Sequence, residues 1–204
     1  MELKGLIVNF LGDSITQGVG TTPPDGIYLN MLKKEKGLKE IRNYGISGTR
    51  FAYQQVPDGL DAYAFTRRFM VMDDDAVLVV VFGGTNDFGH GDAPVGTMND
   101  RTPETFYGAC HFLFSGLIKK YLGKPVIIMT PLHRTEEMLE PESGVRYLKT
   151  YVDIIREVAE YYSLPVLDLY ATAGIQPTIP EVQEKYMPDG LHPNTAGHEI
   201  IAYK

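Results

Sequence analysis

The 204-residue sequence predicts an α/β protein in which a parallel sheet carries helices on both faces. Apolar runs of strand length alternate along the chain with stretches whose apolar residues recur at helical spacing, a pattern typical of βαβ units. Three of the runs are almost continuous in leucine and β-branched residues, as in parallel strands covered on both sides. Ligands of such folds bind beyond the carboxyl ends of the strands, so we expect functional residues directly after strands.

The predicted elements follow from these runs. Five strands are expected, at residues 6–11, 41–44, 76–82, 125–130 and 164–169. Apolar residues recur at helical spacing from Phe106 to Tyr121 and again from Val145 to Tyr162, and a short helix is expected near the C-terminal end. No repeat, low-complexity tract or linker interrupts the pattern, so we predict one domain over residues 1–204.

Composition and charge limit the possible partners. Hydrophobic residues make up 44% of the chain and charged residues 22%, which is ordinary for a globular protein. The net charge of -7 and the pI of about 5.2 argue against nucleic acid or an anionic membrane surface as partner. One cysteine allows no internal disulfide, and no apolar run approaches the ~18 residues of a membrane span. The N-terminal apolar run is too short for a secretory signal, so we expect a cytoplasmic protein unless a signal was removed.

Four unusual polar or glycine-rich segments follow predicted strands. GDSITQG comes after the first strand, NYGISG closes the second, GGTND follows the third, and DGLHP lies between the last strand and the terminal helix. Because parallel strands end at one edge of a sheet, all four segments are expected to meet there.

Each segment also has a purely structural explanation. Asp13 or Ser14 can cap the helix after the first strand, because Asp and Ser are preferred N-cap residues. The glycines of NYGISG can serve a tight turn, and the polar pair of GGTND can cap a helix or close an Asx turn. Asp189 and Gly190 are ordinary turn residues, and Pro193 can begin a helix.

Taken together, the segments favour nucleophilic catalysis. A serine needs a base within hydrogen-bond reach, which an imidazole can supply, and the imidazole needs a carboxylate that orients it. Ser14, His192 and Asp189 provide these groups, and the three-residue spacing of the last two lets one turn place them together. The Asn86 amide, with the backbone N–H groups of Ser14 and Gly48, can hold the oxyanion of a tetrahedral intermediate.

In these four blocks and in their order, the sequence resembles the SGNH hydrolases, also called GDSL-type esterases and lipases. The resemblance covers most of the chain and implies a three-layer α/β/α sandwich, with a five-stranded parallel sheet of flavodoxin-like order 2-1-3-4-5. It implies that Ser14 attacks an acyl carbon, that His192 moves the proton and that Asp189 orients the imidazole. It also implies an oxyanion hole of Ser14, Gly48 and Asn86, and no metal or organic cofactor.

Two long stretches after strands, residues 88–103 and 133–144, are expected to select the substrate. They are polar and glycine-rich, unlike the apolar lid of a lipase that acts at a lipid surface. We therefore expect a small cleft for a short acyl group, which favours acetyl esters and, among them, acetylated sugars. Four residues are candidate substrate contacts: Asp13, Tyr28, Phe88 and His133.

The remaining histidines and acids carry weaker signals. His90 follows the third strand and can reach a substrate. His111 lies within a predicted helix and is expected to be structural or exposed, and His198 is expected to be a surface or packing residue of the terminal helix. No H-x-H, H-E-x-x-H or C-x-x-C spacing indicates a metal site. The acidic run at residues 73–75 precedes its strand, so we expect it at the opposite edge of the sheet.

The predicted function is therefore a serine esterase that works through an acyl-enzyme on a small-molecule ester. A lipase, lysophospholipase or acyl-thioesterase of the same family remains an alternative. A non-catalytic, ligand-binding relative is a second one, although it would be expected to lose Ser14, Asp189 or His192. A flavodoxin-type nucleotide binder would need phosphate-binding glycine motifs that GDSITQG lacks.

Overall fold

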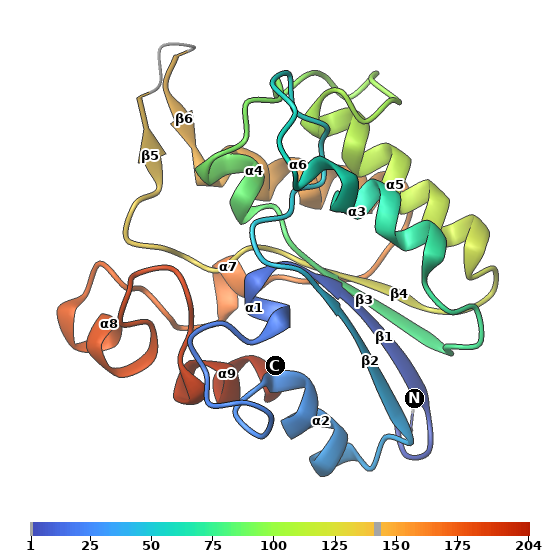
Figure 1. The fold of residues 1–204 in the computed structure, drawn as a ribbon, viewed down its shortest axis with the longest axis vertical. Coiled ribbons are helices and arrows are strands. Elements are labelled where there is room, and N and C mark those ends of the chain that lie inside the picture. The colour runs from blue at the N-terminus through green and yellow to red at the C-terminus, as the bar shows by residue number, and fades with distance from the viewer. Residues whose placement is uncertain (1, 141–143) are drawn as a thin grey trace.

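The computed structural model describes residues 2–140 and 144–204 and has a parallel sheet at its centre (Figure 1). The sheet comprises β1 (Ile7–Gly12), β2 (Glu40–Gly45), β3 (Leu78–Phe82), β4 (Val126–Met129) and β7 (Val166–Leu167). The strands lie in the order β2-β1-β3-β4-β7, and each neighbouring pair is parallel. Counting only these five strands, this is the order 2-1-3-4-5, so the predicted α/β/α sandwich is confirmed.

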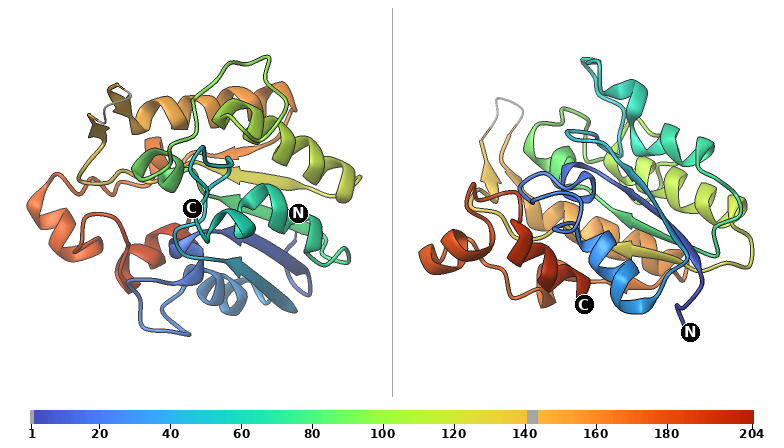
Figure 2. Two further views of the ribbon diagram at one scale, coloured as in Figure 1. Left: turned by 45° about the horizontal axis from the view of Figure 1, so that its top comes forward. Right: turned by 60° about the horizontal axis from the view of Figure 1, so that its bottom comes forward.

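Helices cover both faces of the sheet (Figure 2). One face carries α3 (Phe65–Arg68), α5 (Phe106–Lys120) and α6 (Leu148–Tyr161), and the other carries α2 (Tyr28–Lys36) and α9 (Thr195–Ala202). The shorter helices are α1 (Ser14–Gln17), α4 (Thr85–Gly89), α7 (Leu169–Thr172) and α8 (Pro180–Tyr186), with 3-10 turns η1 (Asp61–Tyr63) and η2 (Phe69–Val71). In the described part of the chain, no helix is both long enough and apolar enough to cross a bilayer.

The helix predicted from Val145 begins later than expected. Residues before α6 form a small antiparallel pair, β5 (Met138–Leu139) with β6 (Arg146–Tyr147), which projects from the body of the molecule (Figure 1). The Leu148 N–H donates to the Glu137 carbonyl, 2.9 Å away, so this pairing holds the chain extended up to the first residue of α6. β5 lies within the predicted substrate-selecting stretch 133–144, of which residues 141–143 fall outside the described part.

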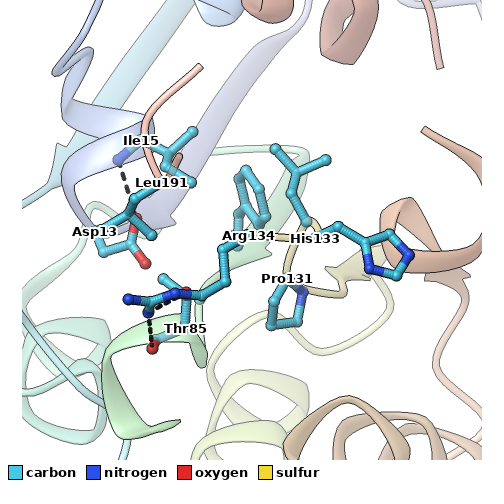
Figure 3. Close-up of a pocket in the computed structure, with 10 residues that line it drawn as sticks. Asp13, Ile15, Thr85, Pro131, His133, Arg134 and Leu191 are labelled. Carbon is cyan, nitrogen blue, oxygen red and sulfur yellow. Dashed lines mark hydrogen bonds between the residues drawn. The ribbon is translucent and has the colours of Figure 1, made fainter. Parts of the chain in front are cut away.

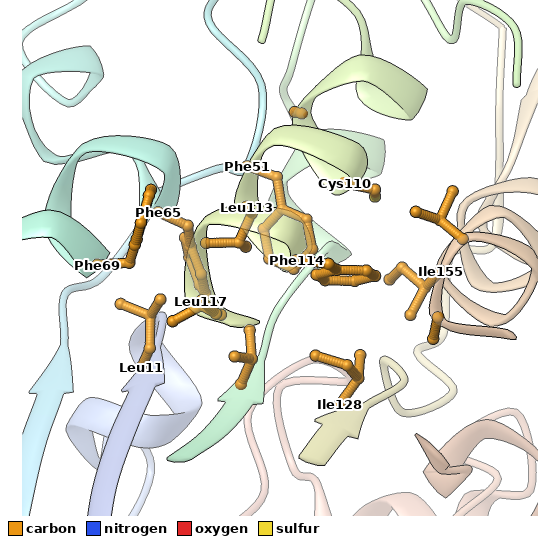
Figure 4. Close-up of a cluster of buried hydrophobic side chains, with 14 of the residues drawn as sticks. Leu11, Phe51, Phe65, Phe69, Cys110, Leu113, Phe114, Leu117, Ile128 and Ile155 are labelled. Atoms are coloured by element: carbon orange, nitrogen blue, oxygen red, sulfur yellow. The ribbon is translucent and has the colours of Figure 1, made fainter. Parts of the chain in front are cut away.

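The sheet separates two apolar clusters, which explains why its inner strands read as continuous apolar runs. Side chains of β3 alternate between them: Val79 and Val81 face the cluster beneath α3, α5 and α6, while Val80 faces the cluster beneath α2 and α9. The first cluster is rich in phenylalanine (Figure 4). There the Phe51 ring stacks on Phe106 with centroids 5.8 Å apart. Burial on both sides stabilises the strands and holds their carboxyl ends at one edge.

Candidate active site

Segments from opposite ends of the chain meet at the carboxyl edge of the sheet. His192 Nε2 lies 3.0 Å from Ser14 Oγ, and His192 Nδ1 lies 2.6 Å from Asp189 Oδ2. An imidazole bonded in this way to a hydroxyl and a carboxylate is able to accept the hydroxyl proton. The three residues singled out in the sequence are therefore brought into one hydrogen-bonded row.

The turn after β1 separates the roles of its two polar residues. Asp13 is the N-cap of α1, and its Oδ1 accepts from the Ile15 N–H at 3.0 Å. Ser14 is the first helical residue and not the cap, so its hydroxyl is left to His192. Gly12 permits this sharp turn, because a Cβ there would lie 1.9 Å from Thr16 Oγ1.

Arg68 joins this turn to the segment after β2. Arg68 Nη2 donates to the Gly12 carbonyl at 3.0 Å and to Thr49 Oγ1 at 2.8 Å, while Arg68 Nη1 donates to the Tyr44 carbonyl. Burial lowers the pKa of Arg68 to about 10. The arginine thus ties the ends of β1 and β2 to the Gly48–Thr49 loop.

Gly48 offers an unused backbone donor in this loop. Its φ of +75° is a conformation that favours glycine, and a Cβ there would lie 2.9 Å from Leu60 Cδ1. Among residues 2–140 and 144–204, no group accepts a hydrogen bond from the Gly48 N–H. This N–H is therefore available to a ligand.

Asn86 does not serve as a helix cap. The N-cap of α4 is Gly84, which makes no side-chain capping bond. Asn86 Nδ2 instead donates to the Thr49 carbonyl at 3.1 Å, and Asn86 Oδ1 lies 3.2 Å from His90 Nε2. One of the two Nδ2 hydrogens remains for another acceptor.

The neighbouring Asp87 holds α4 against the loop that follows Gly48. Its carboxylate accepts from the backbone N–H groups of Phe51 and Ala52 at 3.0 Å. Burial raises the pKa of Asp87 to about 7. Asp87 is thus structural, and with Arg68 it links the three segments that carry Ser14, Gly48 and Asn86.

The acid and base lie on a more exposed turn. Asp189 Oδ1 accepts from the backbone N–H groups of Leu191 at 2.9 Å and His192 at 2.7 Å. Partial burial raises the pKa of Asp189, but the bonds from the His192 backbone and ring outweigh it and hold the pKa below the ordinary value. Gly190, with φ of +77°, closes the turn, and its carbonyl accepts from the Thr135 N–H.

Two of the four candidate substrate contacts do not reach the site. Phe88 is fully buried and packs edge-on against Tyr151, because it faces α6 from the inner side of α4. Tyr28 is also buried, and its hydroxyl lies 3.1 Å from Thr16 Oγ1. Tyr28 and Phe88 therefore do not line a cleft for substrate, contrary to the prediction from the sequence.

Asp13 and His133 do line a pocket, together with Leu191 and Arg134 (Figure 3). In this view the His133 ring lies across the pocket from Asp13, and its Nδ1 is 2.6 Å from Glu137 Oε1. The pocket offers about 10 Å³ for solvent, roughly the space of one water molecule.

The sequence did not reveal the contacts that Arg68 and Arg134 make, or the contact between His90 and the Asn86 amide. Arg134 Nη1 lies 3.4 Å from both the carbonyl and the hydroxyl of Thr85, at the pocket wall. Only the position of Arg134 soon after a strand pointed to it. Arg68 lies within a helix far from any motif, and nothing in its local sequence indicates that it joins β1 to β2.

His111 and His198 are both buried, so of the two expected alternatives the structural one holds. His111 Nδ1 lies 3.1 Å from the Tyr162 hydroxyl, and His198 Nδ1 accepts from the Tyr28 N–H at 3.2 Å. Burial lowers the pKa of His198 to about 4. Within the described ranges, no three His, Cys, Asp or Glu side chains gather as a metal ion would require.

Comparisons with known proteins agree with this architecture. Over its whole length the chain matches the crystal structure of a Lactobacillus plantarum protein, with 31% identity, 94% of that chain covered and a TM-score of 0.85. A lipase/acylhydrolase from Enterococcus faecalis is 21% identical, with 97% and 92% of the two chains covered and a TM-score of 0.63. No curated protein matches.

A third solved structure is a two-domain esterase active on acetylated mannans, which was co-crystallised with mannopentaose. It is 19% identical, with a TM-score of 0.66, and the match covers 98% of this chain but 48% of that one. The profile of the GDSL-like lipase/acylhydrolase family matches residues 10–200, nearly the entire chain. The protein therefore belongs to the GDSL-like lipase/acylhydrolase family.

Proposed function

We propose that the protein is a carboxylic ester hydrolase that forms an acyl-enzyme on Ser14. The observation that carries this proposal is the row of contacts from Ser14 Oγ to His192 Nε2 at 3.0 Å and from His192 Nδ1 to Asp189 Oδ2 at 2.6 Å. The family supports a hydrolase, and the row supplies the groups that ester cleavage by a serine needs.

In the first half of the reaction, His192 Nε2 takes the proton of Ser14 Oγ as the oxygen attacks the ester carbon. The Asp189 carboxylate bonds Nδ1–H, which leaves the Nε2 lone pair facing the serine and stabilises the imidazolium. The depressed pKa of Asp189 keeps this carboxylate ionised. Collapse of the tetrahedral intermediate breaks the ester C–O bond, and His192 gives its proton to the departing alcohol.

Charge on the tetrahedral oxygen is held by three donors: the backbone N–H groups of Ser14 and Gly48 and the free Nδ2 hydrogen of Asn86. Fixed donors of this kind stabilise the transition state because they need no reorientation as charge develops. In the second half, His192 activates a water that attacks the acyl carbon, and the carboxylic acid leaves Ser14 free.

We propose short acyl esters as substrates, acetyl esters above all, with acetylated carbohydrates as one class. The stretches 88–103 and 133–140 support this, since they are polar or glycine-rich and offer no apolar cover for a long acyl chain. The structural likeness to the esterase active on acetylated mannans is consistent with the same class.

A panel of p-nitrophenyl esters from acetate to decanoate tests the proposal, with acetylated sugars and acyl thioesters assayed in parallel. We expect the acetate to give the highest kcat/KM, and acetate release from at least one sugar ester. A preference for chains of roughly ten carbons would overturn the short-acyl proposal, because each buried methylene adds up to ~0.8 kcal/mol in an apolar groove. Absence of turnover on every ester would favour the non-catalytic relative.

A further inference from the structure

A row of polar side chains leads from the surface to the amide of Asn86. Arg50 Nη2 donates to Asp58 Oδ2 at 2.6 Å, and Arg50 Nη1 lies 3.2 Å from His90 Nδ1. His90 Nε2 in turn lies 3.2 Å from Asn86 Oδ1. None of these contacts belongs to the row of Ser14, His192 and Asp189.

The chemistry of Arg50 determines which His90 nitrogen carries the hydrogen. A guanidinium has donors only, so His90 Nδ1 must accept from Arg50 and the hydrogen must lie on Nε2. His90 therefore donates to Asn86 Oδ1. With its oxygen turned to His90, the amide directs Nδ2 to the Thr49 carbonyl and keeps one Nδ2 hydrogen for the oxyanion.

The charges around His90 favour this neutral form. Burial, and then the positive charges of Arg50 and Arg134, lower the pKa of His90, while Asp58 opposes them. A protonated ring would turn an Nδ1–H towards the Arg50 guanidinium. Arg50 is itself 4% exposed in its side chain, and its ion pair with Asp58 holds it in place.

We propose that His90 is a positioning residue that holds the Asn86 side chain in its oxyanion-binding orientation, with Arg50 and Asp58 fixing the His90 ring. This inference rests on the proposed ester hydrolysis and adds an orienting residue to it. An amide without the His90 bond gains rotational freedom, and its flipped form places an acceptor oxygen where negative charge develops. His90 acts only through Asn86 and touches no reacting atom.

A double-mutant cycle tests this role. His90→Ala is expected to lower kcat about 10-fold with little change in KM, the size of coupling typical of bonded neighbours. In an Asn86→Ala background the same change is expected to cost nothing more, because the amide it orients is gone. His90→Gln is expected to recover part of kcat, since its amide can donate to Asn86. Equal losses of kcat in both backgrounds, or a full kcat for His90→Ala, would overturn the proposal.

Arg50→Met and Arg67→Met form a matched pair of variants. Arg50→Met removes the donor to His90 and is expected to lower kcat in the same direction as His90→Ala. Arg67→Met, which removes an exposed guanidinium stacked over Tyr53, is the control and is expected to leave kcat unchanged. Thermal melts of each variant separate a loss of folded protein from a loss of kcat.

Ring nitrogen-15 NMR spectra give a readout that does not depend on turnover. We expect His90 to be neutral at pH 7 with hydrogen on Nε2, and to shift towards the other tautomer in Arg50→Met. A wild-type His90 with hydrogen on Nδ1 would overturn the inference. An inactive wild type with the Nε2–H tautomer would instead remove the ester-hydrolase proposal and leave the anchored amide intact.

Discussion

The two halves of the candidate site are built differently. Ser14 and Asn86, 4% and 5% exposed, follow buried strands. Their segments are tied together by Arg68, which comes from a distant helix, and by Asp87, the neighbour of Asn86, which accepts from the Phe51 N–H 36 residues away. Asp189, with 54% of its side chain exposed, lies on a turn whose hydrogen bonds are mostly to residues two or three positions away. One half depends on tertiary packing and the other on local geometry.

This difference predicts which substitutions lower the stability of the protein and which lower only its activity. In the half with Ser14, a change to a residue that ties segments together should cost stability as well as activity. In the turn with Asp189 and His192, a change should cost activity with little loss of stability, because exposed groups contribute little to folding. Four predictions test this contrast.

The largest expected effect is that of Ser14→Ala. Ser14 lies in the buried half, yet its hydroxyl bonds only His192 and ties no segments together. We expect kcat to fall by about five to six powers of ten, as in other serine triads, with a melting temperature close to wild type. Near-normal turnover in a folded variant would exclude the serine mechanism.

Asp189→Asn should be the next most damaging to kcat. An amide can still accept from the backbone of the turn, but it no longer selects the Nδ1–H tautomer of His192 or stabilises the imidazolium. We expect kcat to fall about 10⁴-fold with only a small change in the free energy of unfolding. Steady-state kinetics and urea titrations on one preparation measure both, and a large loss of stability would show that this turn is not locally held.

Asn86→Ala should lower kcat by about 10²–10³-fold with little change in KM, the typical cost of losing one oxyanion donor. Since its amide also bonds the Thr49 carbonyl in the buried half, we expect a measurable loss of stability, unlike that of Asp189→Asn. Asn86→Asp should be at least as damaging, because it puts an acceptor at the oxyanion. A destabilised but fully active Asn86→Ala would make Asn86 purely structural.

The smallest expected effect is on the pH dependence of stability. Burial raises the pKa of Asp13 from 3.8 to about 6, so the folded state binds more protons than the unfolded state between these values. Stability should therefore fall as pH rises from 4 to 6, by up to about 2 kcal/mol from this group. Asp13→Asn, which can still cap α1, should flatten that decline in urea titrations at each pH.

The ionisation of Asp189 should change the stability of the protein with pH in the opposite direction. Its pKa is held below the ordinary value, so its stabilisation is present above the unfolded pKa and is lost as pH falls. Asp189→Asn should therefore leave the fall in stability from pH 4 to 6 unchanged. Below pH 4, where the wild type loses stability as Asp189 is protonated, the variant should lose less. An unchanged slope in Asp13→Asn would mean that its carboxyl titrates normally in the folded state.

The fold was predictable because its signals are local. The apolar runs of β1 and β3 must be covered on both faces, and strands of that kind form parallel sheets. The start of α6 was not predictable, since the pairing of Arg146 and Tyr147 with β5 overrides the helical spacing. The helix α2 was missed because its sequence, with three lysines in the last turn, gives weak apolar periodicity.

Residue types and their spacing were sufficient to infer which groups form the candidate site. Asp189 and His192 share one turn because three residues separate them, Asp13 caps because its side chain reaches the Ile15 N–H, and Gly12 gives the space that a sharp turn needs. Such relations involve atoms within a few residues, so residue type and spacing are sufficient to infer them.

Which side chains reach the site depends on tertiary packing. Phe88 lies two residues from Asn86, yet packing against Tyr151 turns it into the core, while His90 turns to the Asn86 amide. Arg68 joins the ends of β1 and β2 across separations of 56 and 24 residues. These contacts depend on how the helix layers pack on the sheet, and the spacing of residues in the sequence carries no information about that packing.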